Sequence, residues 1–333
     1  MEMPARWLLH RILPLASRIA SHSRKHASIR VNRFSSLYSS NRYYYIRMPI
    51  EQKDKEVILT LPSDESTSVK ILLHGANILS WTIAGKEQLW LSEGAILDGS
   101  KAVRGGVPLV FPVFGKAGLG PTSTLPQHGF ARLSTWEFLG QVSASPLTVQ
   151  FGLGPENVSD AFRKAWDFDF TLIYTIALGE DTLETAMRVE NTSKVNWDFQ
   201  ILFHTYFRIP DLDKVEVNGL TGVTVKDKVS KSDYSELNNS VTVTSETDRV
   251  YENVNNDVLI ASAGKALFHI YRKNVADVVV WNPWVNASKN MGDFRPEDGY
   301  KSMICVEAGS VSKWTTLCPG QTWECSEKIK SLL

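Results

Sequence analysis

Residues 168–178, with the sequence FDFTLIYTIAL, place a large apolar side chain at every second position from Phe168 to Leu178. A period of two is that of a β-strand with one buried face. Residues 183–190 form a second such run, and the three residues between them, Gly179-Glu180-Asp181, are a short turn signal. The two runs together predict an antiparallel hairpin.

Further strand-like runs surround this hairpin. Residues 69–73 and 78–83 flank a turn, and shorter runs lie at 215–217, 241–244, 266–271, 278–281 and 315–317. After the first 47 residues the sequence lacks convincing helical periodicity, and no repeat has a fixed period. Many short strands separated by turns predict an all-β fold, a large antiparallel β-sandwich that forms one domain over residues 48–333.

The first 47 residues have a different composition from the rest. They contain nine arginine or lysine residues against a single acid, Glu2, and serine is frequent between residues 17 and 40. An Arg-rich and Ser-rich segment that is poor in acids is typical of a mitochondrial transit peptide. The alternative is an untranslated or disordered extension, with Met48 as the real start. We expect a cytoplasmic protein, with mitochondria as the alternative location.

Composition excludes several classes of function. The 36 basic and 36 acidic residues balance, whereas a nucleic-acid partner favours a basic excess. The three cysteines have no C-x-x-C spacing and are odd in number, which indicates a reducing compartment without a structural metal. No apolar stretch is long enough to cross a bilayer. We therefore expect no nucleic-acid or membrane partner. We also expect a monomer, although no feature of the sequence reveals whether the protein self-associates.

Glu307 interrupts an otherwise apolar strand pattern. In the run MICVEAG (303–309) it shares one face with Met303 and Cys305, and the opposite face is also apolar. A carboxylate in such a place loses hydration, so its pKa rises and it becomes a plausible proton acceptor near neutral pH. The alternative is a structural glutamate held by an ion pair or by backbone amides.

His204 lies in a second unusual strand, residues 198–208. Alternation puts Phe199, Phe203 and Thr205 on one face of this strand, whereas His204 shares the other face with polar residues. A lone histidine on a strand is more often structural than catalytic. Its role depends on partners elsewhere in the chain.

Three loop segments offer such partners. Arg104 precedes a glycine pair, which lets backbone approach a ligand closely while the guanidinium offers a fork to an oxyanion. The segment QHGFAR (127–132) crowds an amide, an imidazole and a guanidinium into six residues, a density more typical of a site than of a core. Asp248 could accept hydrogen bonds from sugar hydroxyls. By itself the Arg104 motif favours a tight turn with a surface arginine, and Asp248 could equally be a solvated turn residue.

Taken in order, these segments resemble the hexose-6-phosphate mutarotases, also called glucose-6-phosphate 1-epimerases, of the aldose 1-epimerase superfamily. The matching residues are RGGVPLVFP (104–112), QHGFAR (127–132), His204, TDR (247–249), WNPW (281–284) and VE (306–307). The resemblance runs from about residue 56 to the C-terminus. It implies a galactose mutarotase-like β-sandwich and an isomerase that uses no metal or organic cofactor.

The resemblance also implies roles for individual residues. Glu307 would be the base and His204 the acid that open and reclose the sugar ring. Gln127, His128 and Asp248 would hold the sugar, and Arg104 and Arg132 would bind the phosphate of a hexose 6-phosphate. Trp281 and Trp284 either stack on the sugar or belong to the core.

Two alternatives remain open at this point. One is an enzyme of the same fold that acts on free aldoses, and the other is a sugar-phosphate binding protein without catalysis. The paired acid and base favour an enzyme, because a binding protein needs neither.

Overall fold

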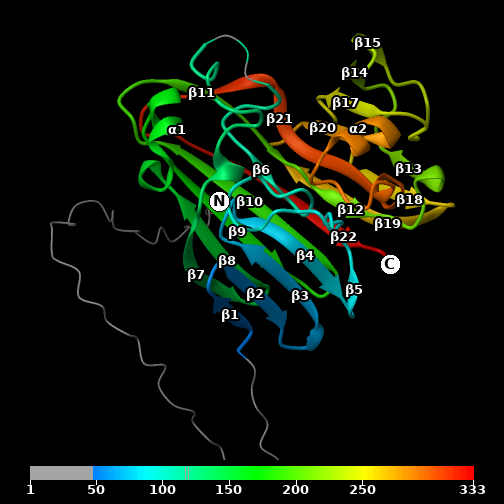
Figure 1. The fold of residues 1–333 in the computed structure, drawn as a ribbon, viewed down its shortest axis with the longest axis horizontal. Coiled ribbons are helices and arrows are strands. Elements are labelled where there is room, and N and C mark those ends of the chain that lie inside the picture. The colour runs from blue at the N-terminus through cyan, green and yellow to red at the C-terminus, as the bar shows by residue number, and fades with distance from the viewer. Residues whose placement is uncertain (1–47, 117, 119) are drawn as a thin grey trace, which may run out of the picture. The chain divides into compact units, whose positions relative to one another are not determined.

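The strands of this protein form three antiparallel sheets in a computed structural model that describes residues 48–116, 118 and 120–333 (Figure 1). The expected leader over residues 1–47 lies outside the described residues. Among those that are described, no helix is long and apolar enough to cross a membrane.

The largest sheet has nine strands and contains the predicted hairpin. In spatial order they are β16 (Ser240–Val241), β13 (Val215–Asn218), β18 (Val258–Ser262), β19 (Lys265–Lys273), β22 (Thr322–Ser331), β10 (Thr182–Asn191), β9 (Phe170–Leu178), β8 (Leu147–Leu153) and β7 (Glu137–Ala144). Strands β9 and β10 pair with Leu178 opposite Leu183, as the turn signal requires. Burial alternates along β9 without a break, which confirms the period of two.

The second sheet has eight strands, and two of them carry Asp248 and Glu307. In spatial order they are β15 (Ser232–Ser235), β14 (Thr224–Asp227), β17 (Thr247–Glu252), β20 (Asp277–Asn282), β21 (Met303–Leu317), β11 (Trp197–Phe203) and β6 (Leu109–Val110), with β12 (Tyr206–Arg208) also paired to β21. Strand β21 therefore pairs with β20 along one edge and with β11 and β12 along the other.

The third sheet and the helices are smaller. The sheet contains, in order, β1 (Ile50–Lys53), β2 (Glu56–Leu61), β3 (Asp64–Leu72), β4 (Asn77–Ile83) and β5 (Lys86–Glu87). The α-helices are α1 (Asp160–Ala165) and α2 (Trp284–Asn290), and single 3₁₀ turns lie at Ala131–Leu133, Pro155–Asn157, Leu212–Lys214 and Gly299–Ser302. Helices this short show no periodicity in a sequence.

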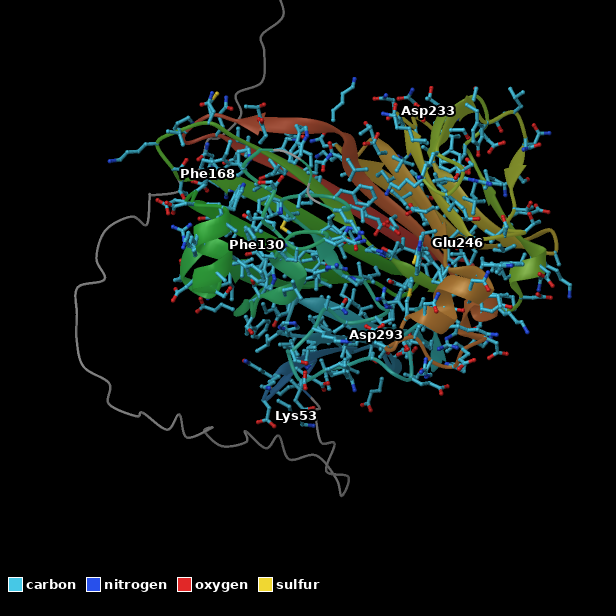
Figure 2. The ribbon with its side chains drawn as sticks, turned by 45° about the horizontal axis from the view of Figure 1, so that its top comes forward. Lys53, Phe130, Phe168, Asp233, Glu246 and Asp293 are labelled. Carbon is cyan, nitrogen blue, oxygen red and sulfur yellow. The ribbon has the colours of Figure 1, made fainter. Side chains whose placement is uncertain are left out.

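The two large sheets pack face to face and enclose the core. Phe203 of β11 stacks on Tyr174 of β9 with ring centroids 6.3 Å apart, and Phe207 of β12 contacts Phe268 of β19 at 4.9 Å. Figure 2 shows the interior filled by side chains such as Phe130, whereas Lys53 and Asp233 lie at the periphery. The predicted antiparallel β-sandwich is confirmed.

The structure differs from the sequence-based strands in three places. The expected strand over residues 198–208 is divided into β11 and β12 by His204 and Thr205. The runs at 303–309 and 315–317 belong to one strand, β21, whose pairing with β11 shifts register between Phe199 and Ile201. The predicted strand at 241–244 is only the two-residue β16. Local alternation does not reveal how far a neighbouring strand extends, and that neighbour decides where pairing ends.

Candidate active site

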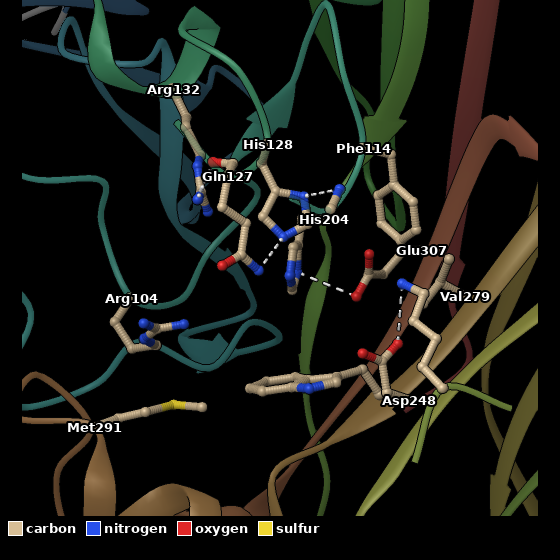
Figure 3. Close-up of a pocket in the computed structure, with 13 residues that line it drawn as sticks. Arg104, Phe114, Gln127, His128, Arg132, His204, Asp248, Val279, Met291 and Glu307 are labelled. Atoms are coloured by element: carbon tan, nitrogen blue, oxygen red, sulfur yellow. Dashed lines mark hydrogen bonds and ion pairs between the residues drawn. The ribbon is translucent and has the colours of Figure 1, made fainter. Parts of the chain in front are cut away.

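A cavity of about 210 Å³ lies on the face of the eight-stranded sheet that is turned away from the nine-stranded sheet. All seven predicted site residues line it, namely Arg104, Gln127, His128, Arg132, His204, Asp248 and Glu307. The remaining lining residues are Phe114, Gly115, Lys228, Val279, Trp281 and Met291. Segments more than 200 residues apart in the sequence therefore meet in one place (Figure 3).

His204 and Glu307 face each other because of a local break between β11 and β12. Phe203 pairs with Ala308 and Tyr206 pairs with Cys305, so the register places His204 opposite Glu307. The chain bends at this point, and the His204 N–H donates to the Pro108 carbonyl instead of to β21. His204 Nδ1 lies 3.3 Å from Glu307 Oε1.

Burial controls the charge of this pair. Glu307 is 1 % exposed, and burial, followed by the negative charge of Asp248, raises its pKa well above the ordinary value. Burial, followed by the positive charges of Arg132 and Arg104, lowers the pKa of His204 well below its ordinary value. Both shifts favour the uncharged form of each group, and in those forms the pair holds one proton in total.

Tyr206 limits the orientation of the His204 ring. The two rings stack with centroids 4.8 Å apart and an angle of 10° between their planes. The Tyr206 hydroxyl accepts a hydrogen bond from Arg104 Nη1 at 3.4 Å. The histidine is thus connected to a cation through one aromatic ring.

His128 lies beside His204, with ring centroids 5.8 Å apart. Its Nδ1 accepts a hydrogen bond from the Gly115 N–H at 3.3 Å. The Gln127 amide lies 3.2 Å from Nε2. Burial, followed by the charge of Arg132, lowers the pKa of His128 well below its ordinary value and favours the neutral ring.

The tight turn after His128 depends on glycine. Gly129 has a φ of +70°, and a Cβ there would lie 2.1 Å from the Phe111 carbonyl oxygen. The loop that carries His128 can therefore press against residue 111 only with glycine at this position.

The two arginines lie on one side of the cavity and the carboxylates of Asp248 and Glu307 on the other, with the imidazoles between them (Figure 3). Arg104 Nε contacts Asp293 at 3.3 Å. Burial lowers the pKa of Arg104, but Tyr206 and Asp293 outweigh it and raise the pKa above the ordinary value. Burial lowers the pKa of Arg132 to about 10, so both groups are cationic at neutral pH.

The glycine pair after Arg104 has a different role from the one the sequence suggested. A Cβ on Gly106 would lie 2.0 Å from the Ile78 carbonyl oxygen, and one on Gly105 would lie 2.6 Å from the Trp90 carbonyl oxygen. Both glycines are buried among protein backbone. The expectation that they admit a ligand was therefore wrong. They let the Arg104 loop pack against the neighbouring strand, β4, and the segment at residue 90.

Lys228 is a lining residue that the sequence analysis missed. Its Nζ lies 3.3 Å from Asp248 Oδ1 and 3.9 Å from the centre of the Phe114 ring. The residue follows β14 in a segment that looks like an ordinary charged turn, and β14 and β17 pair at a distance in sequence. No signal in the sequence separates it from the other surface lysines.

The two tryptophans of the WNPW segment have separate places. Trp281 lines the cavity and lies edge-on to His204, with ring centroids 5.9 Å apart. Trp284 packs against Tyr300 instead. Only the first of them could contact a sugar.

Cys305 adds a thiol next to the acid and base. Its Sγ, a nitrogen of His204 and an oxygen of Glu307 all lie within 4.8 Å of one another. Burial raises the pKa of this thiol well above its ordinary value. A metal needs the thiolate, so a protonated and fully buried thiol is a poor ligand. The absence of a metal cofactor stays a prediction.

Comparison with protein families identifies one match over most of the chain. A family model described as aldose 1-epimerase matches residues 57–330. A protein of Escherichia coli strain K12, provisionally named glucose-6-phosphate 1-epimerase, is 35% identical over 269 residues, which are 79% of this chain and 86% of that protein. A protein of Cenchrus ciliaris with the same provisional name is 33% identical over 266 residues, 76% of this chain and 78% of the relative.

Solved structures show the same architecture. The crystal structure of a provisionally named mutarotase from Salmonella typhimurium superposes with a TM-score of 0.73 at 30% identity, covering 84% of this chain and 92% of that one. A galactose 1-epimerase from Lactobacillus acidophilus superposes with a TM-score of 0.63 at 16% identity, covering 85% of this chain and 97% of that one. The latter similarity concerns the fold alone.

Proposed function

Because the chain belongs to the aldose 1-epimerase family, we propose that it interconverts the α and β anomers of glucose 6-phosphate. The observation that carries this proposal is the contact between His204 and Glu307 on the wall of a cavity that also holds two arginines. The names of the relatives from Escherichia coli and Cenchrus ciliaris support the same substrate.

Interconversion requires the sugar ring to open, the aldehyde to rotate and the hydroxyl to add back from the other face. One group removes the proton of the anomeric hydroxyl, and another gives a proton to the ring oxygen. We assign Glu307 as the base and His204 as the acid, with the roles exchanged on ring closure. The pair acts in this cycle when its one proton lies on His204, so that Glu307 takes a proton from one sugar oxygen and His204 returns one to another.

The other lining residues would bind the substrate. Arg104 and Arg132 would hold the phosphate, since guanidinium groups match its oxygen atoms with paired donors. Gln127, His128 and Asp248 would hydrogen-bond the sugar hydroxyls. The separation of the two arginines from the carboxylates of Asp248 and Glu307 across the cavity supports this division.

The test is a direct comparison of sugars. Two-dimensional exchange NMR measures the interconversion of anomers for glucose 6-phosphate, glucose and galactose with the purified full chain. We expect rapid exchange of glucose 6-phosphate and slow exchange of the free sugars. Faster exchange of galactose would favour a free-aldose enzyme, and binding of glucose 6-phosphate without exchange would favour a binding protein.

We also propose a monomeric cytoplasmic enzyme that needs no cofactor and no nucleic-acid or membrane partner. Balanced charge supports the absence of a nucleic-acid partner. A fluorescent protein fused after residues 1–47 tests the location, because import into mitochondria would establish the alternative. Light scattering of the purified chain tests the oligomeric state.

A further inference from the structure

A second buried glutamate, Glu327, lies behind the candidate active site. It is on the core side of the strands that position His204 and Glu307. Thr205 follows His204, and its side chain points into the core, where it is fully buried. The Thr205 hydroxyl donates to Glu327 Oε2 at 3.0 Å. Glu327 belongs to β22 of the nine-stranded sheet, so this contact connects the two layers of the sandwich.

Thr205 occupies the bend that brings His204 and Glu307 together. Its N–H donates to the Phe203 carbonyl at 2.9 Å rather than to a neighbouring strand. The side-chain hydroxyl is therefore the group that ties this residue to the rest of the core. Without it, the bend would lose its anchor on the core side.

Glu327 also lies close to β21, the strand that carries Glu307. The backbone N–H of Ala308, the residue after Glu307, interacts with the Glu327 carboxyl group and favours its charged form. One side chain thus contacts the immediate neighbours of both His204 and Glu307. Its other oxygen, Oε1, has no hydrogen-bond partner of normal geometry among the described residues.

We propose that Glu327 is a positioning residue that sets the distance between His204 and Glu307 through Thr205 and the backbone at Ala308. The proposal rests on the acid and base roles proposed above. A shift of about 1 Å between reacting groups is enough to lower a rate by roughly a hundredfold, so an anchor at this point matters for turnover more than for substrate binding.

The surroundings of Glu327 make its role depend on pH. Burial raises its pKa to about 8, against the hydrogen bond from Thr205, the charge of Arg272 on β19 and the N–H of Ala308. The other titratable groups that face it are Tyr174 on β9, Cys325 on β22 and Glu307 on β21. At neutral pH the carboxyl is protonated. Above about pH 8 it becomes a carboxylate and raises the pKa of Glu307 further.

Thr205→Val is the main test, because it removes the hydroxyl and keeps the shape. We expect kcat for glucose 6-phosphate to fall between about tenfold and a hundredfold while KM stays within about twofold. Thr205→Ser, which keeps the hydroxyl, should restore most of kcat.

Thr67→Val is the matched control. Thr67 is also buried, and its hydroxyl donates to a carboxylate, Asp64, at 2.6 Å, but it lies in the five-stranded sheet. Its kcat should equal that of the wild type. A Thr205→Val variant with wild-type kcat, or an equal loss of kcat in both variants, would overturn the proposal.

Glu327→Gln tests the same proposal if Thr205→Val does not fold. Its amide stays neutral at every pH, so kcat of the variant should fall less above pH 8 than kcat of the wild type. Identical pH profiles would overturn the proposal. Glu307→Gln in the same assay distinguishes a failure of this inference from a failure of the proposed function. If that variant is fully active, the proposed catalytic roles are wrong, whatever the result for Thr205→Val.

Discussion

Glu307 and Glu327 lie on consecutive strands, β21 and β22. Glu307 is 1 % exposed and Glu327 is 0 % exposed. Burial is also the largest cause of the raised pKa of each carboxyl group. The difference is the surface that each one faces. Glu307 borders a cavity and an imidazole, whereas Glu327 contacts a threonine hydroxyl between the sheets. A raised pKa therefore does not make a carboxyl group catalytic unless a substrate can reach it.

Replacing each glutamate by glutamine is the strongest test of this comparison. Glu307→Gln should lower kcat for glucose 6-phosphate by about 10²- to 10⁴-fold, because the amide matches the carboxylate in shape but cannot accept the proton. Glu327→Gln should lower it by less than about tenfold at neutral pH, since the native group is already neutral there. Exchange NMR at saturating substrate measures both, and similar losses would end the distinction.

The cationic side of the cavity allows a test that leaves both glutamates intact. Replacing Arg104 and Arg132 by alanine should reduce the preference for glucose 6-phosphate over glucose by about 10²-fold or more, because each charge-assisted hydrogen bond contributes about 1.5–3 kcal/mol. KM for the phosphorylated sugar should rise, and the slow turnover of glucose should change far less. A preference equal to that of the wild type would show that the phosphate is held elsewhere.

The pH dependence of kcat/KM reports the protons held by the pair. The pair should lose activity on the acid side only below pH 6.5, the ordinary pKa of histidine, because burial lowers the pKa of His204. On the alkaline side it should lose activity well above pH 4.5, the ordinary pKa of glutamate, because burial raises that of Glu307. The residual activity of His204→Asn should lack the alkaline limb, because the remaining base, Glu307, needs only to be deprotonated. A wild-type profile that is flat from about pH 5 to 9 would contradict the assignment.

The smallest expected effect is on the pH dependence of protein stability, which tests whether Glu327 is protonated when buried. Glu327 binds its proton up to about pH 8 in the folded state but only up to about 4.5 in the unfolded chain, so wild-type stability falls as pH rises between these values. Glu327→Gln lacks this loss. Its free energy of unfolding relative to the wild type should therefore rise between pH 5 and 8 by on the order of a few kcal/mol, as urea titrations would measure. A constant difference across that range would show that Glu327 is ionised when buried.

Much of this protein follows from its sequence. The alternation of residues 168–178 and 183–190 determines a hairpin, because side chains at every second position must share one buried face. The residues quoted for the family resemblance include all seven predicted site residues that line the cavity. Short motifs were enough to predict these residues, because each polar side chain lies within a few residues of a turn or of the end of a strand.

The tertiary structure decided the rest. Lys228 reaches the cavity only because β14 pairs with β17, a strand distant in sequence. Glu327 looks like an ordinary charged residue in its own strand, and its contact with Thr205 exists because two sheets pack face to face. Alternation assigns a side chain to a face of its strand. Whether that face borders a cavity or a packed core depends on the other layer, which no local pattern contains.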